Sequence, residues 1–281
     1  MIPAPFEYQR ATSLDDALAA LAGGDAKVLA GGMSLLPLMK LRLASPGKLV
    51  DIGGLEELKA IGQTPDGGYE TGALATYADV LAVTPLGVSK ECIEGIGDIQ
   101  VRNRGTIGGA LSHADPASDI PALALALDYS VVLRSSRGER TVPLDGFFLG
   151  AFQTAIEPDE ILIKGVRPPV PAGASGSYQK LEQPASGYSI VGVCAVVAKD
   201  GGTISHARVA LTGVGDVAYR AKAVESALVG SDGSAAAIAA AAEHATDGQT
   251  VSGDIHADRD YRARMAVVYT RRAIEAALAR V

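Results

Sequence analysis

The segment from Gly97 to Asp119, GDIQVRNRGTIGGALSHADPASD, constrains this chain more than any other part of its sequence. It contains a Gly-Gly pair, and the backbone amides of such a pair can approach an anionic group closely because no Cβ intervenes. Another Gly-Gly pair lies upstream, in Val28 to Pro37, VLAGGMSLLP. In chain order, we call Val28 to Pro37 the first glycine segment and Gly97 to Asp119 the second. Two separated phosphate-type loops predict one extended ligand with two phosphates, held from both sides. A dinucleotide fits this description.

The composition is typical of a folded globular protein. The chain has 281 residues, of which 48% are hydrophobic and 20% charged, enough for two or three lobes with a sizeable core. A net charge of −7 disfavours a nucleic-acid partner. No apolar run is long enough for a membrane span, and the start, MIPAPFEYQR, lacks the pattern of a secretory signal. We therefore expect a cytoplasmic protein that binds no nucleic acid.

Cysteine and histidine usage argues against a metal centre in this chain. An iron–sulfur cluster needs about four cysteine ligands, and the chain has only Cys92 and Cys194. We interpret both as small buried apolar residues rather than as a disulfide. The four histidines form no H-E-x-x-H motif, and no G-x-S-x-G motif precedes a predicted helix. The residues therefore support neither a metalloenzyme nor a hydrolase.

Capping and periodicity predict the order of the elements. Ser13 is a good N-cap for a helix that begins at Leu14, and Gly23 and Gly24 end it. The run Pro168 to Gly176 is the best domain boundary. Apolar runs predict strands over residues 27–30, 49–52, 69–74, 129–134, 140–143, 160–166, 178–181, 190–198 and 204–211. Helices are predicted over residues 35–43, 76–81, 121–127, 218–229, 235–243 and 260–280.

The last predicted helix carries one apolar face. Because these side chains recur at helical spacing, we expect the face to pack on the sheet of its own domain rather than against a partner. The face consists of Val267, Thr270, Ile274, Leu278 and Val281. Together with the strands, this helix predicts an α+β fold.

Five segments resemble the FAD-binding medium subunit of the molybdenum hydroxylases, the family of carbon monoxide dehydrogenase and xanthine dehydrogenase. The most specific match is RNRGTIGG, and the other pieces, in the family's order, are AGGMSLLPLMKLRLASPGKLVDI, GALATYADV, DEILIKGVRPP and YQKLEQPASGYSIVGVCAVV. They cover most of residues 1–200. The resemblance implies a two-lobed PCMH-type FAD-binding domain, residues 1–55 and 56–170, followed by a C-terminal antiparallel sheet-plus-helices domain, residues 176–281.

The resemblance also implies which loop residues bind FAD. Met33 stands where several family members have histidine, and because a thioether cannot form the covalent link, we expect noncovalent FAD. Ile107 matches a residue that lies against the flavin ring, and Ala110 replaces the Ser or Asn of many members, which removes at most one side-chain hydrogen bond. The expected residues are Leu29, Ala30, Gly31, Gly32, Met33, Ser34 and Leu35 in the first loop, and Thr106, Ile107, Gly108, Gly109 and Ala110 in the second.

Four further positions match family residues near the flavin. Asp119 matches an FAD-contacting acid, although it also fits the N-cap of a helix. Leu162 and Lys180 match a pair beside the ring, where a lysine would stabilise the negative charge of a reduced flavin. A lysine in a strand is otherwise a solvated surface charge. Tyr188 matches an aromatic residue that covers one face of the ring in some members.

The implied function is electron transfer within a heteromeric molybdenum hydroxylase. A small 2Fe-2S subunit would supply electrons to this chain, and a large molybdopterin subunit would oxidise the substrate. An external acceptor would then take the electrons. Iron–sulfur and molybdopterin groups are expected only on these partners, a dimer of heterotrimers is the implied assembly, and no catalytic residue is assigned here.

Two alternative functions remain open from the sequence. One is a stand-alone FAD-dependent oxidoreductase, which would need its own substrate pocket, and no acid–base pair marks one. The other is a noncatalytic assembly scaffold that has lost its flavin. The substrate of the complex and its electron acceptor stay open.

Overall fold

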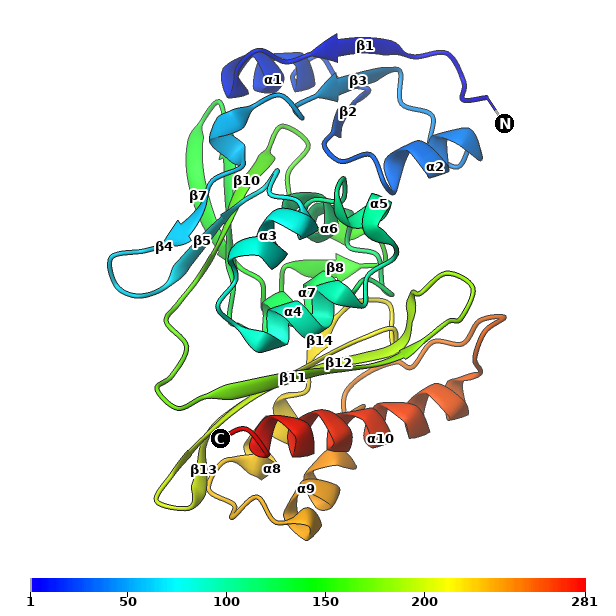
Figure 1. Ribbon diagram of the computed structural model, residues 1–281. Coiled ribbons are helices and arrows are strands. Elements are labelled where there is room, and N and C mark those ends of the chain that lie inside the picture. The colour runs from blue at the N-terminus through cyan, green and yellow to red at the C-terminus, as the bar shows by residue number, and fades with distance from the viewer. Residues whose placement is uncertain (1) are drawn as a thin grey trace.

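The N-terminal lobe is a small parallel sheet covered by one helix. The computed structural model describes residues 2–281, and Figure 1 shows this lobe at one end of the molecule. The Ser13 hydroxyl accepts a hydrogen bond from the Asp16 amide, so the predicted start of the first helix is confirmed. The strands lie in the order β1 (Glu7–Arg10), β3 (Lys48–Asp51) and β2 (Ala26–Leu29), and the helices are α1 (Leu14–Leu21) and α2 (Leu35–Lys40).

Two details of this lobe differ from the prediction. β1 was not predicted, because three of its four residues are exposed and no apolar pattern marks it. α2 ends at Lys40, earlier than the predicted Leu43, because Arg42 adopts a left-handed backbone with φ of +59° that no helix continues through.

The second unit is a five-stranded antiparallel sheet with a group of short helices beside it (Figure 1). Its strands run in the order β4 (Ile61–Gln63), β5 (Tyr69–Gly72), β10 (Ile161–Arg167), β6 (Ser130–Ser135) and β7 (Gly138–Pro143). The shorter elements are η1 (Glu56–Leu58), α3 (Tyr77–Val83), α4 (Gly87–Glu94), α5 (Ile99–Arg102), α6 (Ile107–His113), α7 (Asp119–Ala126), β8 (Phe148–Gly150) and β9 (Gln153–Thr154).

The sequence prediction missed α4 and α6. No side chain caps the start of α4, and α6 has two glycines, Gly108 and Gly109, in its first turn, which are poor helix formers. Thr106 nevertheless caps α6, since its hydroxyl accepts a hydrogen bond from the Gly109 amide. Gly108 and Gly109 therefore lie in the first turn of a capped helix, and the prediction of a loop at this Gly-Gly pair is wrong.

The C-terminal unit is a four-stranded antiparallel sheet packed between helices. The long helix of this unit lies on β11 and β12, and Thr270 and Ile274 on its apolar face are fully buried. The prediction that this face packs on its own sheet is confirmed for Val267, Thr270, Ile274 and Leu278, but it is wrong for Val281, which lies beyond the end of the helix and is 47% exposed. The strands are β11 (Ser175–Glu182), β12 (Ser189–Asp200), β13 (Thr203–Thr212) and β14 (Tyr219–Arg220), and the helices are α8 (Lys222–Leu228), α9 (Ala235–Ala242) and α10 (Arg259–Leu278).

The two larger units share one hydrophobic core. α7 lies on the face of the C-terminal sheet opposite α10, where it contacts β12 and β13 (Figure 1). Cys92 and Cys194 are both buried in this core and unpaired, which confirms the interpretation of them as small apolar residues. None of the helices within residues 2–281 combines the length and apolarity needed to cross a membrane.

Candidate functional site

A cavity of about 1360 Å³ brings together almost all of the predicted site residues. Both glycine segments line it, and so do Asp119, Leu162 and Tyr188. Ile107 and Lys180 are the two predicted residues that do not line it among residues 2–281. Ile107 is instead 7% exposed and belongs to the hydrophobic core. The cavity is large enough for an extended ligand rather than a single small molecule.

The first glycine segment lines this cavity and contains a row of free backbone donors. Within the described part of the chain, the five consecutive amides from Gly31 to Leu35 donate to no protein acceptor. The helical hydrogen bonds of α2 begin with the Leu36 amide, which donates to the Gly32 carbonyl. Unpaired amides beside a cavity need an acceptor, and a phosphate group supplies several. The segment therefore fits an anionic ligand.

Glycine is required in this segment by the protein itself. A Cβ on Gly31 would overlap the carbonyl group of Arg104, so the two glycine segments touch at this point. Gly32 has a φ of +77°, in the left-handed region that favours glycine. The glycines thus hold the two segments together and shape the turn that leaves the amides free.

The second glycine segment differs, because its amides are already bonded. The amides of Ile107 and Gly108 donate to the carbonyls of Ala75 and Ala73, at 3.0 and 2.9 Å. The Gly109 amide is bonded to the capping hydroxyl of Thr106. The expectation of a second nest of free amides here is therefore wrong. A Cβ on Gly108 would lie 2.7 Å from the Ala73 carbonyl oxygen, so this glycine serves close packing of α6.

Asp119 lies on the cavity wall, and its carboxylate is held entirely by the C-terminal sheet. Its Oδ1 accepts hydrogen bonds from the hydroxyls of Tyr178 and Ser189, both at 2.6 Å. Its Oδ2 accepts from Lys180 Nζ at 2.8 Å. The Lys180 side chain is only 10% exposed and also donates to the Gly95 carbonyl. Lys180 is therefore a buried cation behind the wall, and the alternative of a solvated surface charge is wrong.

Sequence reasoning missed Tyr178 and Ser189. Tyr178 lies in a predicted strand and Ser189 directly before one, and both side chains are buried, where a hydroxyl needs a partner. The need of a buried hydroxyl for a hydrogen-bond partner is the signal that could have found these two residues. It does not tell which acceptor each hydroxyl uses.

Aromatic side chains border another part of the cavity. Tyr188 is 46% exposed, and burial together with the carboxylates of Asp115 and Asp119 raises the pKa of its hydroxyl. The ring of His113 lies 5.0 Å from that of Phe152, and burial lowers the pKa of this imidazole, so it is neutral at pH 7. Phe152 has a φ of +59°, unusual for a bulky residue. Planar groups such as these can stack on the rings of a ligand.

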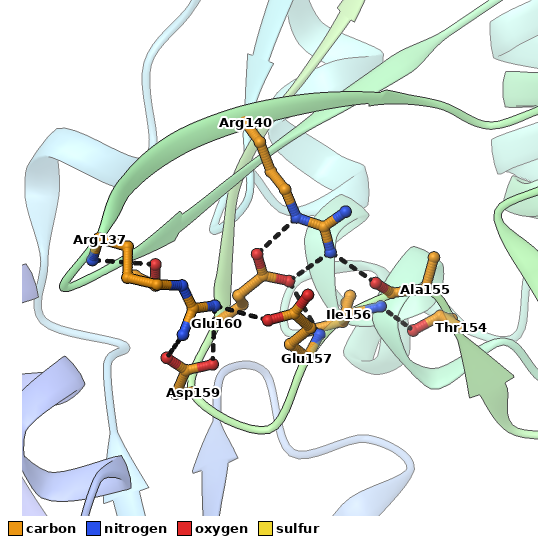
Figure 2. Close-up of polar contacts among 9 residues, drawn as sticks. Arg137, Arg140, Thr154, Ala155, Ile156, Glu157, Asp159 and Glu160 are labelled. Carbon is orange, nitrogen blue, oxygen red and sulfur yellow. Dashed lines mark hydrogen bonds and ion pairs between the residues drawn. The ribbon is translucent and has the colours of Figure 1, made fainter.

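The segment from Thr154 to Glu160 forms a further wall and is held by two arginines. Figure 2 shows Arg137 and Arg140 pointing toward its carboxylates. Arg140 binds both oxygens of Glu160, at 2.6 and 2.7 Å, and also donates to the Ala155 carbonyl. The Glu160 side chain is 2% exposed, and the Arg140 guanidinium holds its pKa below the usual 4.5. This fork fixes the backbone of the wall.

Replacing Glu160 by glutamine should therefore give a pH-dependent loss of stability. A carboxyl whose pKa is lowered in the folded state stabilises the fold above its unfolded pKa, and this contribution disappears as the pH falls through the folded value. We expect Glu160→Gln to lower the free energy of unfolding by about 1 to 2 kcal/mol at pH 7. The difference from the wild-type protein should narrow below pH 4.5. Urea unfolding from pH 7 to pH 3.5 measures it, with Glu56→Gln, on an exposed pair, as the control. A pH-independent difference would contradict the role of this fork.

Comparisons with known proteins find similar family models and relatives along nearly the whole chain. Residues 4–171 match the FAD binding domain in molybdopterin dehydrogenase, and residues 176–277 match the CO dehydrogenase flavoprotein C-terminal domain. The carbon monoxide dehydrogenase medium chain of Hydrogenophaga pseudoflava is 40% identical, with 100% of this chain and 99% of that protein covered. Subunit alpha of the 6-hydroxypseudooxynicotine dehydrogenase complex of Paenarthrobacter nicotinovorans is 35% identical, with 100% and 97% covered.

Solved structures show the same fold. Carbon monoxide dehydrogenase from Hydrogenophaga pseudoflava contains a chain that superposes with a TM-score of 0.96 at 41% identity, with 100% of this chain and 99% of that chain covered. Quinoline 2-oxidoreductase from Pseudomonas putida 86 contains one with a TM-score of 0.91 at 33% identity, with 99% and 98% covered.

Proposed function

We propose a function from one premise: the chain belongs to the family of FAD-binding medium subunits of the molybdenum hydroxylases of carbon monoxide dehydrogenase type. In our proposal it binds one FAD noncovalently in the cavity between its glycine segments. It receives electrons from an iron–sulfur subunit and passes them to an external acceptor. The observation that carries the proposal is the row of free amides from Gly31 to Leu35 beside a cavity of suitable size.

The residues present fit FAD. The free amides of Gly31 to Leu35 would hold the pyrophosphate, with the Ser34 hydroxyl as a further donor. The bonded amides of Gly108 and Gly109 would instead form a rigid wall against which the ligand lies. Leu162 and Tyr188 would border the flavin ring, and Asp119, paired with Lys180, would place a carboxylate in the wall of the same cavity. The proposed site is completed by five further residues of the cavity lining and one residue of the core. They are Leu29, Ala30, Met33, Thr106 and Ala110 in the lining, and Ile107 in the core.

Bound FAD would supply the ability to accept and release electrons, which no amino-acid side chain here provides. The chain has two cysteines in all, so a four-cysteine cluster must belong to another subunit. We therefore propose a small 2Fe-2S subunit as the electron donor and a large molybdopterin subunit as the site of substrate oxidation. The names of the relatives, which are subunits or chains of dehydrogenase complexes, support this division.

The arrangement of the sheets supports the proposed division into residues 1–55, 56–170 and 176–281. Each part contains one of the three main sheets. The first two parts nevertheless share a core cluster, in which Leu58, Leu74 and Ile161 pack with the N-terminal lobe. We propose that they act as one FAD-binding unit. The cytoplasm remains the proposed location.

The purified chain is expected to carry flavin at a ratio of one per chain. Because Met33 offers no attachment point, acid precipitation should leave all of the flavin in the supernatant. Absorbance at the flavin maximum before and after precipitation measures both quantities. A colourless protein that takes up no added FAD would contradict the proposal and favour the scaffold.

Reconstitution tests the role in electron transfer. Mixed with the small and large subunits encoded beside it, the chain should elute with them in size-exclusion chromatography. It should also be required for turnover with an external acceptor. Turnover by the flavin-loaded chain alone would favour the stand-alone oxidoreductase.

A further inference from the structure

The hydrogen bonds of the Asp119 carboxylate connect the FAD-binding unit to the C-terminal unit. Asp119 begins α7, whereas its three side-chain donors come from β11 and β12. Only 4% of the residue is exposed, so its charge is shielded by these donors rather than by water. The orientation of this cavity-wall carboxylate is therefore set by the other unit.

The donors on the two oxygens differ in kind. Lys180 supplies a full positive charge to Oδ2, and the pair is buried on both sides. The hydroxyls of Tyr178 and Ser189 supply two neutral hydrogen bonds to Oδ1. Neutral donors add no charge, but they spread that of the carboxylate and fix the rotation of its side chain.

The field of this carboxylate reaches other groups around the cavity. The Asp119 charge adds to burial in raising the pKa of Tyr77 and of Tyr188, and Tyr188 lines the cavity. A ligand in the cavity would feel the same charge, because Asp119 lines the cavity and is only 4% exposed, so its charge is weakly screened by solvent.

We propose that Tyr178 and Ser189 are positioning residues that hold the Asp119–Lys180 pair against the cavity, and that the C-terminal unit thereby tunes the potential of the bound flavin. The proposal rests on the function proposed above. Without either hydroxyl, more of the carboxylate's negative charge acts on the flavin. Reduction, which adds negative charge to the flavin, then becomes less favourable.

Tyr178→Phe and Ser189→Ala in the full-length, FAD-loaded chain test this role. Each should lower the midpoint potential of the flavin at pH 7, because the less compensated carboxylate disfavours the added negative charge of the reduced flavin. The matched control is Tyr219→Phe. Tyr219 is also buried in the C-terminal unit, but its hydroxyl donates to the Ala245 carbonyl, away from Asp119. This control loses a comparable hydrogen bond and should keep the wild-type potential.

The outcomes separate this inference from the proposed function. A lower potential in both variants, with none in Tyr219→Phe, supports the positioning role. If both variants keep the wild-type potential or raise it, the inference is overturned while the FAD function stands. An equal shift in Tyr219→Phe would also overturn it, since general loosening would then be the cause. If the wild-type chain binds no FAD, the proposed function fails and the inference fails with it.

Discussion

Replacing Gly31 by alanine is expected to weaken FAD binding by about two to four orders of magnitude. The added Cβ would overlap the carbonyl group of Arg104, which is backbone and cannot swing aside. The first glycine segment must therefore shift, and the amides from Gly31 to Leu35 lose their alignment. The range corresponds to losing two charge-assisted hydrogen bonds of about 1.5 to 3 kcal/mol each.

Gly23→Ala is the matched control for this substitution. Gly23 lies in the same lobe, and its nearest neighbour to an added Cβ is the Ala20 carbonyl oxygen at 3.8 Å, an ordinary contact. Fluorescence titration of the apoprotein with FAD measures affinity, and urea unfolding shows how much stability the overlap costs, about 1 to 3 kcal/mol. If Gly31→Ala bound FAD as tightly as Gly23→Ala, the assignment of this segment to the pyrophosphate would be wrong.

Lys180→Met is expected to lower the free energy of unfolding of the apoprotein by about 3 to 5 kcal/mol. The methionine matches the lysine stem in length, but the Asp119 carboxylate stays buried without its countercharge. The exposed pair Lys59–Glu56 provides the comparison. Its side chains are 38% and 79% exposed, so Lys59→Met should cost less than about 1 kcal/mol.

A double-mutant cycle isolates the contribution of the buried pair. Asp119→Asn alone should also destabilise the apoprotein, since it leaves the Lys180 ammonium buried without a carboxylate. The double variant carries no buried charge and should lose less stability than the two single variants added together. Urea unfolding of all four proteins gives the coupling free energy. Additive losses would show that Lys180 and Asp119 do not interact as the geometry indicates.

Local features of the chain were predictable from the sequence because they depend on neighbouring residues. The start of α1 follows from Ser13 and the helix formers after it, and the turn at Gly31–Gly32 follows from residues that tolerate a left-handed backbone. The face of α10 follows from apolar spacing of 3.6 residues. Elements without such a signature were missed, as with the exposed strand β1 and the uncapped helix α4.

The roles of the site residues depended on contacts between distant parts of the chain. Both glycine pairs look alike in the sequence, yet the amides of Gly31 and Gly32 are free, whereas the Gly108 amide donates to the Ala73 carbonyl, which the fold carries to α6, and the Gly109 amide to the Thr106 hydroxyl. Asp119 meets Tyr178 and Ser189 across separations of 59 and 70 residues. The residue types of a binding site are thus readable in order along the chain. Whether an amide or a carboxylate is left free for a ligand depends on which distant partners reach it, because each buried polar group must be paired once the chain is folded.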